Sequence, residues 1–168
     1  MKKVLQFSGL IAAVIAVVAF VLLLATPGIV YANGGISYSI DGNAVLFGST
    51  TNIIGSLNAT TKGAVIALIG WILIIIAFLG LVFGFILPMV KKDLSKAAGM
   101  LNLCAAICLI VAGIMLFFTL PSYASANGWS KTDYYGLGAG WVVAGILAIV
   151  AGACALCPTI ANFVGKKK

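Results

Sequence analysis

Residues 64–90 read AVIALIGWILIIIAFLGLVFGFILPMV, an unbroken run without a charged side chain. A helix needs about 20 residues to cross the ~30 Å hydrocarbon core of a bilayer, so this run is long enough to span a membrane. Working outward along the chain, three further uncharged stretches occupy residues 7–26, 98–120 and 137–164. The sequence therefore predicts an all-α integral membrane protein: a bundle of four transmembrane helices that forms one membrane domain over residues 1–168.

The composition agrees with this prediction and excludes several classes of function. Of the 168 residues, 63% are hydrophobic and 8% are charged, whereas a soluble domain is about half apolar and about a quarter charged. The chain has no His, Glu or Arg, and none of the four stretches carries an ionisable side chain at mid-depth. Most acid–base, metal-binding and ion-coupled transport chemistry is therefore missing. We expect no enzymatic activity, no cofactor and no metal.

The lysines indicate how the chain lies in the membrane. Four spans place eight of the ten lysines on one side: Lys2, Lys3, Lys91, Lys92, Lys96 and 166–168. Lys62 and Lys131 fall on the other side. The positive-inside rule then predicts a multi-pass protein of the plasma membrane with cytoplasmic N- and C-termini. The net charge of +7 is thus a topology signal; we expect the lipid bilayer as a partner and no nucleic acid.

An alternative concerns the first span. Lys2 and Lys3, an apolar run, and Val30-Tyr31-Ala32 before Asn33 resemble a secretory signal peptide with a small-residue cleavage site. Cleavage there would leave three spans and an external N-terminus. The run over residues 7–26 is longer than the usual apolar region of such a signal, which favours a retained helix.

The four prolines form two matching pairs, which suggests a tandem repeat of two helices. Pro27-x4-Ala-Asn-Gly matches Pro121-x4-Ala-Asn-Gly, and Pro88 and Pro158 each follow a Gly-Trp pair by the same interval. Proline ends or kinks a helix, and Asn-Gly is typical of turns. We therefore predict two halves with the same orientation, related by an axis along the membrane normal. The alternative is convergence, since Pro and Trp gather at span ends.

The loops at residues 28–61 and 121–136 are predicted to lie outside the cell. In the first, residues 36–40 (ISYSI) alternate with a period of two, and Asp41-Gly42 is a turn signal before residues 43–47 (NAVLF). This pattern predicts a small extracellular β-hairpin or sheet that turns at Asp41-Gly42. The second loop, with Trp129, Tyr134 and Tyr135, is expected to add a third strand or an aromatic cap.

This layout resembles that of the claudin and peripheral-myelin-protein group. The shared features are four spans, cytoplasmic termini, a long strand-bearing first outer loop and a shorter second one. The resemblance extends over the whole chain but is one of layout: the first loop has no Trp and no Cys, so no family signature residue is carried over. It implies a non-enzymatic protein that works by contacts in the membrane and at its outer face.

Small residues in the spans indicate close helix packing. They are Gly80 and Gly84 in the second span and Ala144, Ala148 and Gly152 in the fourth. Such residues let helix backbones approach closely, either within the bundle or between copies. The spans also carry four cysteines, Cys104, Cys108, Cys154 and Cys157, which we interpret as small apolar packing residues. A four-thiolate metal site, palmitoylation and a disulfide are the alternatives.

The sequence thus predicts a structural or assembly membrane protein, a scaffold, a junction-like component or an accessory subunit. We expect a homo-oligomer or a complex with a membrane-protein partner. The candidate contact surface consists of the apolar and aromatic loop residues Tyr38, Phe47, Trp129, Tyr134 and Tyr135. Alternatively, these residues only hold the two loops together. The alternative function is an oligomeric channel or pore for small solutes, which would lie between copies because one four-span bundle has no room for a wide aqueous path.

Overall fold

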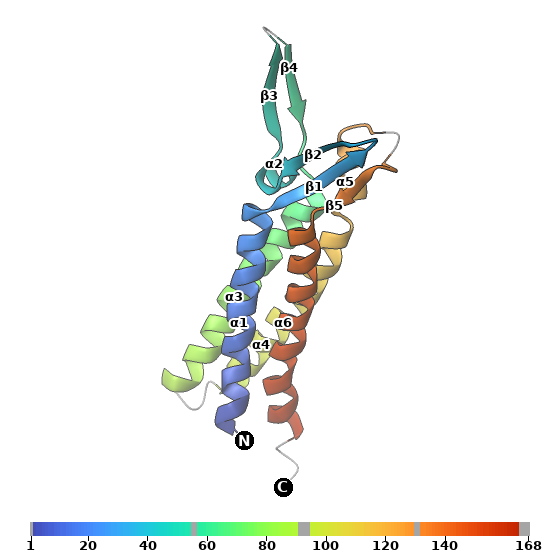
Figure 1. The fold of residues 1–168 in the computed structure, drawn as a ribbon. Coiled ribbons are helices and arrows are strands. Elements are labelled where there is room, and N and C mark those ends of the chain that lie inside the picture. The colour runs from blue at the N-terminus through green and yellow to red at the C-terminus, as the bar shows by residue number, and fades with distance from the viewer. Residues whose placement is uncertain (1, 55–56, 91–94, 130–131, 165–168) are drawn as a thin grey trace.

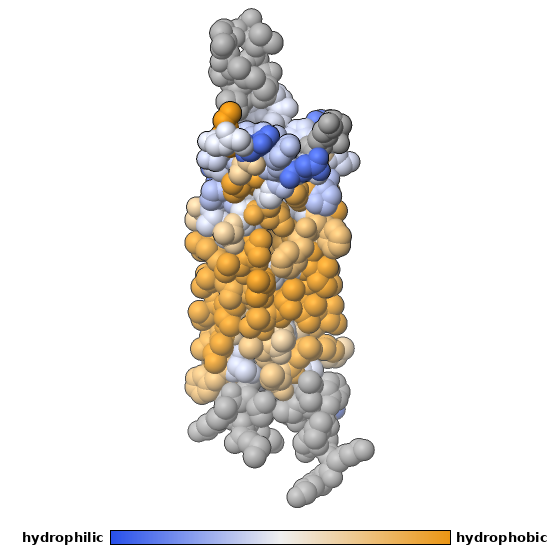
Figure 2. All heavy atoms as spheres, turned by 45° about the vertical axis from the view of Figure 1, so that its right-hand side comes forward, coloured by the Kyte–Doolittle hydropathy of each residue, from blue (hydrophilic) through white to orange (hydrophobic). Residues whose placement is uncertain are grey.

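The computed structural model describes residues 2–54, 57–90, 95–129 and 132–164. Four long helices dominate it (Figure 1): α1 (Lys2–Ala25), α3 (Val65–Val90), α4 (Ser95–Phe117) and α6 (Ala139–Val164). Each contains a segment long and apolar enough to cross a membrane, as the sequence predicts. Figure 2 shows a continuous hydrophobic belt around the helices on the visible face, with hydrophilic residues above it.

The four helices form a ring of antiparallel neighbours. Helix α4 packs against both α3 and α6, and α1 packs against α6 and, less extensively, against α3. Helix α1 begins and α6 ends at the same end of the bundle (Figure 1), which we call the terminal end. The opposite end carries the strands and is called the sheet end. This up-and-down arrangement is the usual result of joining helices of similar length in sequence order.

Alanines fill the interior of the bundle. Fully buried examples come from all four helices: Ala12, Ala16 and Ala19 of α1, Ala67 and Ala77 of α3, Ala106 and Ala112 of α4, and Ala144, Ala148 and Ala151 of α6. Small side chains allow the helix backbones to come close, which is how helices associate in lipid. Larger apolar residues such as Val14, Ile76 and Phe83 are exposed on the outside of the bundle, where acyl chains would cover them.

The sheet end holds a three-stranded antiparallel sheet in the order β2-β1-β5. Its strands are β1 (Pro27–Asn33), β2 (Ile36–Asp41) and β5 (Tyr135–Leu137). Gly34 and Gly35 connect β1 to β2, and both have a positive φ, of 59° and 83°. A two-residue turn with two positive φ angles matches the twist of a hairpin and needs residues without a side-chain penalty. Strand β5 brings the second connection of the chain alongside the first.

A second, separate sheet consists of β3 (Ser49–Ile54) paired with β4 (Leu57–Thr61). We call these two strands the ribbon. It projects beyond the three-stranded sheet, away from the bundle (Figure 1). Within the described part of the chain, neither strand pairs with any strand but the other. Each therefore presents one edge of unpaired backbone groups.

The predicted turn at Asp41-Gly42 is wrong, although the strand at residues 36–40 is confirmed. The partner of β2 is β1 before it, and the residues after it form a short helix, α2 (Gly42–Phe47). The reason is burial: Val45 and Leu46 are 0% and 2% exposed. Adjacent side chains of a strand point to opposite faces, so a strand would expose one of the two, whereas a helix buries both. Tyr38 thus lies opposite Tyr31.

The matching proline segments differ in structure. Pro27 begins β1, whereas Pro121 lies in the first turn of α5 (Thr119–Ala126), a helix in the stretch expected to be a loop. Both segments share a positive φ at the glycine after Asn, 59° at Gly34 and 68° at Gly128. Pro88 and Pro158 each fall within a long helix and do not end it. The tandem repeat therefore stays a prediction, and the local structure at the first proline pair counts against it.

Candidate functional site at the sheet end

Three tyrosines form a row across the three-stranded sheet. Tyr31 of β1 lies opposite Tyr38 of β2 and Tyr135 of β5 in the strand register, so the three side chains share one face. The ring centroids of Tyr31 lie 4.8 Å from Tyr38 and 4.9 Å from Tyr135. The hydroxyl oxygens of Tyr38 and Tyr135 are 2.6 Å apart. We call these residues the aromatic row.

The row continues into the interior through Trp129. The Trp129 ring centroid lies 4.5 Å from that of Tyr135 and 5.3 Å from that of Tyr123 in α5, and Tyr123 is fully buried. Tyr134 contacts Tyr31 edge-on at 6.3 Å but is itself 54% exposed. The structure thus brings four of the five predicted contact residues together, and three of their six ring contacts hold the two loops to each other.

Phe47 lies apart from this cluster. It ends α2, is 57% exposed, and its ring meets Trp71 of α3 edge-on at 5.6 Å. Trp71 in turn stacks on Phe20 of α1 at 5.3 Å. Among the described residues, no ring contact joins Phe47 to the aromatic row. Phe47 therefore belongs to a contact between the ends of α1, α2 and α3.

The environment of Tyr38 favours its neutral form. Its hydroxyl hydrogen bond with Tyr135, partial burial, and the neighbouring Tyr135 and Tyr31 together raise the pKa of Tyr38 from 10.0 to about 12. A hydrogen bond that a phenol donates stabilises its neutral form, because ionisation removes the donated proton. The pKa of Tyr38 is therefore a reporter of the contact between β2 and β5.

Asn127 clamps the two loops at a second point. Its side-chain oxygen accepts a hydrogen bond from the backbone N–H of Lys62 at 2.8 Å, and its amide nitrogen donates to the Lys62 carbonyl at 2.9 Å. The same nitrogen donates to the Tyr123 carbonyl at 2.9 Å. The end of α5 is thereby fixed to the segment between β4 and α3. The sequence pattern identifies Asn127 only as a turn residue.

Hydrogen bonds to backbone carbonyl groups attach the sheet to the bundle. Trp141, near the start of α6, is buried and donates from its indole N–H to the Leu23 carbonyl at 3.2 Å. The backbone N–H of Gly138 donates to the Gly28 carbonyl at 2.9 Å. A Cβ atom at Gly138 would overlap the carbonyl of Pro27. The start of α6 and the start of β1 can approach this closely only because position 138 is glycine.

The predicted packing residues lie at contacts between helices of the same chain. A Cβ added at Gly80 would meet Ala105 of α4, and one at Gly84 would overlap the side chain of Asn102, also in α4. Ala144, Ala148 and Gly152 are buried in α6, and a Cβ at Gly152 would crowd Ile110 of α4. Gly80, Gly84 and Gly152 thus lie where α3 and α6 pack on α4, and Ala144 and Ala148 are buried inside the bundle.

The four cysteines are free thiols. Cys104 and Cys157 are exposed on the bundle surface, and Cys108 and Cys154 are partly buried. Over the described ranges, no three of the His, Cys, Asp and Glu side chains gather where they could hold a metal ion. The arrangement of the thiols therefore gives no support to the four-thiolate alternative.

Tyr31 is the main residue that the sequence pattern misses. Residues 27–33 resemble the end of a helix followed by a turn, so the strand containing Tyr31 is not expected. The available signal is the segment Asn33-Gly34-Gly35 between GIVYA and ISYSI, which is typical of a two-residue hairpin turn between β-prone runs.

Comparison with known proteins adds no function: no family model matches this sequence, and no curated protein is significantly similar to it.

Proposed function

We propose that this chain is a non-enzymatic structural or assembly protein of the cell membrane, claudin-like in layout, that binds further copies of itself through its sheet end. The sheet end lies outside the cell and both termini lie in the cytoplasm. The observation that carries the proposal is the ribbon, because a chain that needs only to cross the membrane four times has no use for it.

The energetics of the ribbon support a partner. Fixing each residue costs about 1–2 kcal/mol of backbone entropy, and an isolated two-stranded ribbon is only marginally stable in water. The two strands nevertheless pair from Ser49↔Thr61 to Ile54↔Leu57, with one register shift between Asn52 and Ile54. Pairing with a strand of another copy would supply the missing backbone hydrogen bonds.

The residue types of the ribbon favour the same proposal. Proteins protect free strand edges with lysine, proline or inward-pointing charges. Residues 49–61 read STTNIIGSLNATT and contain no charged residue and no proline. The edges therefore carry none of these protecting residue types. Each copy has two such edges, so copies can associate in series.

The lysines and the packed interior support the remaining parts of the proposal. The lysine-rich segments join or flank the long helices at the terminal end, which the positive-inside rule assigns to the cytoplasm. Buried alanines and larger apolar side chains such as Leu81 and Leu109 fill the bundle, which favours a contact role over conduction through one copy.

Photo-crosslinking tests the proposal. A photoreactive side chain is placed at Thr60, which is exposed on β4, in cells that express two differently tagged copies. We expect a crosslinked dimer that carries both tags. The matched control is Ile146, which is 51% exposed on α6 and should give lipid adducts instead. The same yield of dimer from both positions, or none from Thr60, would contradict the proposal.

A further inference from the structure

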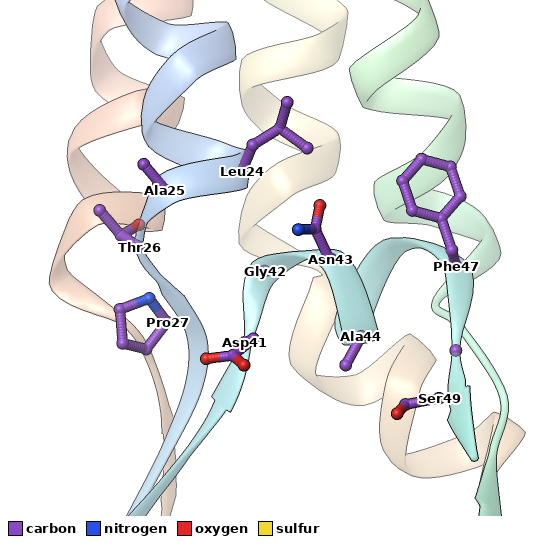
Figure 3. Close-up of a pocket in the computed structure, with 11 residues that line it drawn as sticks. Leu24, Ala25, Thr26, Pro27, Asp41, Gly42, Asn43, Ala44, Phe47 and Ser49 are labelled. Carbon is purple, nitrogen blue, oxygen red and sulfur yellow. The ribbon is translucent and has the colours of Figure 1, made fainter. Parts of the chain in front are cut away.

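A pocket of about 520 Å³ lies where α1 ends and α2 begins (Figure 3). One wall is apolar and comes from Leu24 and Ala25 of the last turn of α1 and from Phe47. The other wall is polar and includes Asp41, Asn43 and Ser49. The pocket therefore straddles the border between the hydrophobic belt and the polar sheet end.

The polar groups of the pocket include several hydrogen-bond acceptors. Asp41 precedes α2 but its side chain does not cap that helix, so the carboxylate oxygens are free of that role. The hydroxyl of Thr26 already donates to the Leu22 carbonyl at 2.6 Å, which leaves its oxygen as an acceptor. Helix α1 ends at the pocket, and a helix C-terminus carries a partial negative charge.

No lysine lines the pocket, although lysine is the only cationic residue type in this chain. An anionic group would therefore find no charged partner there. A primary ammonium group, by contrast, offers three N–H donors and a positive charge to the Asp41 carboxylate. The pocket is suited to a small cation with several N–H donors.

An apolar stripe connects the pocket to the middle of the belt. Val14, Val18 and Val21 of α1 are 40–60% exposed, and Ala25 in the pocket wall continues their spacing of four, three and four residues. Such residues lie on one face of a helix. In Figure 3, Asn43 and Phe47 point toward the same side as Leu24, and the Asp41 carboxylate lies beside Pro27. A ligand in the pocket can thus be polar at Asp41 and apolar along α1.

We propose that this pocket binds the head group of an ethanolamine phospholipid, with the ammonium at Asp41 and an acyl chain along the valine stripe of α1. Choline lipids carry no N–H donor, and glycerol lipids carry no positive charge. The site therefore favours a primary ammonium over the choline and glycerol head groups.

Native mass spectrometry of the full chain in detergent tests the selection. Phosphatidylethanolamine, phosphatidylcholine and phosphatidylglycerol with identical acyl chains are titrated separately. Charge-assisted hydrogen bonds should make the ethanolamine lipid bind about tenfold more tightly than the choline lipid. Soluble phosphoethanolamine at equal concentration should leave the lipid bound, because it lacks the acyl chain. Equal binding of the lipids, preference for the glycerol lipid, or displacement by the soluble amine would overturn the proposal.

Paired substitutions locate the site. Asp41→Asn keeps the shape of the side chain and should reduce the preference for the ethanolamine lipid about tenfold. Asp133→Asn removes the same charge from another exposed position at the sheet end and should leave the preference unchanged. Asn43→Ala, also at an exposed position, is a second test if Asp41→Asn does not fold, and should weaken binding in the same direction. Equal effects of Asp41→Asn and Asp133→Asn, or unchanged binding by Asn43→Ala, would contradict the assignment.

Discussion

The hydroxyl oxygens of Tyr38 and Tyr135 lie 2.6 Å apart, although 97 positions separate the two residues in the chain. The contact passes over Tyr31, which stacks on Tyr38 at 4.8 Å, and joins the first long connection to the second. The aromatic row therefore fixes the three-stranded sheet as one unit. In the proposed association, contact with another copy falls to the ribbon, whose strands pair only with each other in the described part of the chain.

The stability of the sheet should fall between pH 10 and pH 12. The pKa of Tyr38 rises from 10.0 to about 12 on folding, so in this range the unfolded chain has released the phenolic proton and the folded chain retains it. The stabilisation is fully present below pH 10 and is lost as the pH rises through the folded pKa. The thermal midpoint, followed by near-UV circular dichroism, should decline over this range.

Substitution of Tyr38 provides the control for that pH dependence. Tyr38→Phe removes the titrating group, so the decline between pH 10 and pH 12 should become smaller. Tyr134→Phe removes an exposed tyrosine of the same cluster and should leave the decline as in the unsubstituted chain. A steeper decline in Tyr38→Phe would show that Tyr38 does not carry the effect.

Loss of the Asn127 clamp should destabilise the sheet end. Asn127→Ala removes the hydrogen bonds to both backbone groups of Lys62, which are exposed, and a typical hydrogen bond contributes about 0.5–1.5 kcal/mol net. Asn127→Asp retains an acceptor for the Lys62 N–H but loses the donor to the Lys62 carbonyl. Its unfolding midpoint should therefore lie between those of the unsubstituted chain and of Asn127→Ala. The measurement is the midpoint of thermal unfolding; equal midpoints for all three chains would contradict the clamp.

Much of this fold is predictable from composition and some of it is not. The four long helices follow from uncharged stretches of about 20 residues, a constraint that lipid imposes on any sequence. The strand at Ile36 follows from its alternation. The helix at Val45 and Leu46 does not, because its burial depends on a contact with α1 that lies outside any local pattern. There, Gly42 approaches the Leu23 carbonyl.

The contact residues, too, are only partly predictable from the sequence. Tyr38, Trp129 and Tyr135 are recognisable as aromatic residues in loops, but only strand register reveals that they meet around Tyr31. A Tyr38 and Phe47 double substitution is therefore a poor test of self-association, since it disturbs the aromatic row and the contact with Trp71. The ribbon offers a test that leaves both in place.

A methyl group at Gly138 should disrupt the junction between sheet and bundle. Gly138→Ala would place Cβ against the Pro27 carbonyl, whereas a Cβ at Gly136 meets nothing within 4 Å. Overpacking of this kind costs about 1–3 kcal/mol, and Gly136→Ala should change stability by less than about 0.5 kcal/mol. Comparison of their urea midpoints checks the difference, and similar losses in both variants would refute the close approach.

The proposed orientation is tested by accessibility in intact cells. Epitope tags at Met1 and Lys168 should be protected from external protease because both termini are assigned to the cytoplasm. A cysteine introduced at Tyr134, which is 54% exposed at the sheet end, should react with a membrane-impermeant maleimide. Cleavage of either tag by the external protease would contradict the proposed topology.

Self-association through the ribbon is the central claim, and the mass of the protein in mild detergent tests it most directly. Residues 50–60 are replaced by Asn-Gly, which suits a two-residue turn because Ser49 and Thr61 are opposite partners. Light scattering should give an oligomer for the full chain and a monomer for the shortened chain, with the helical bundle folded in both. An unchanged oligomer after shortening, or a full chain that is already monomeric, would contradict the account.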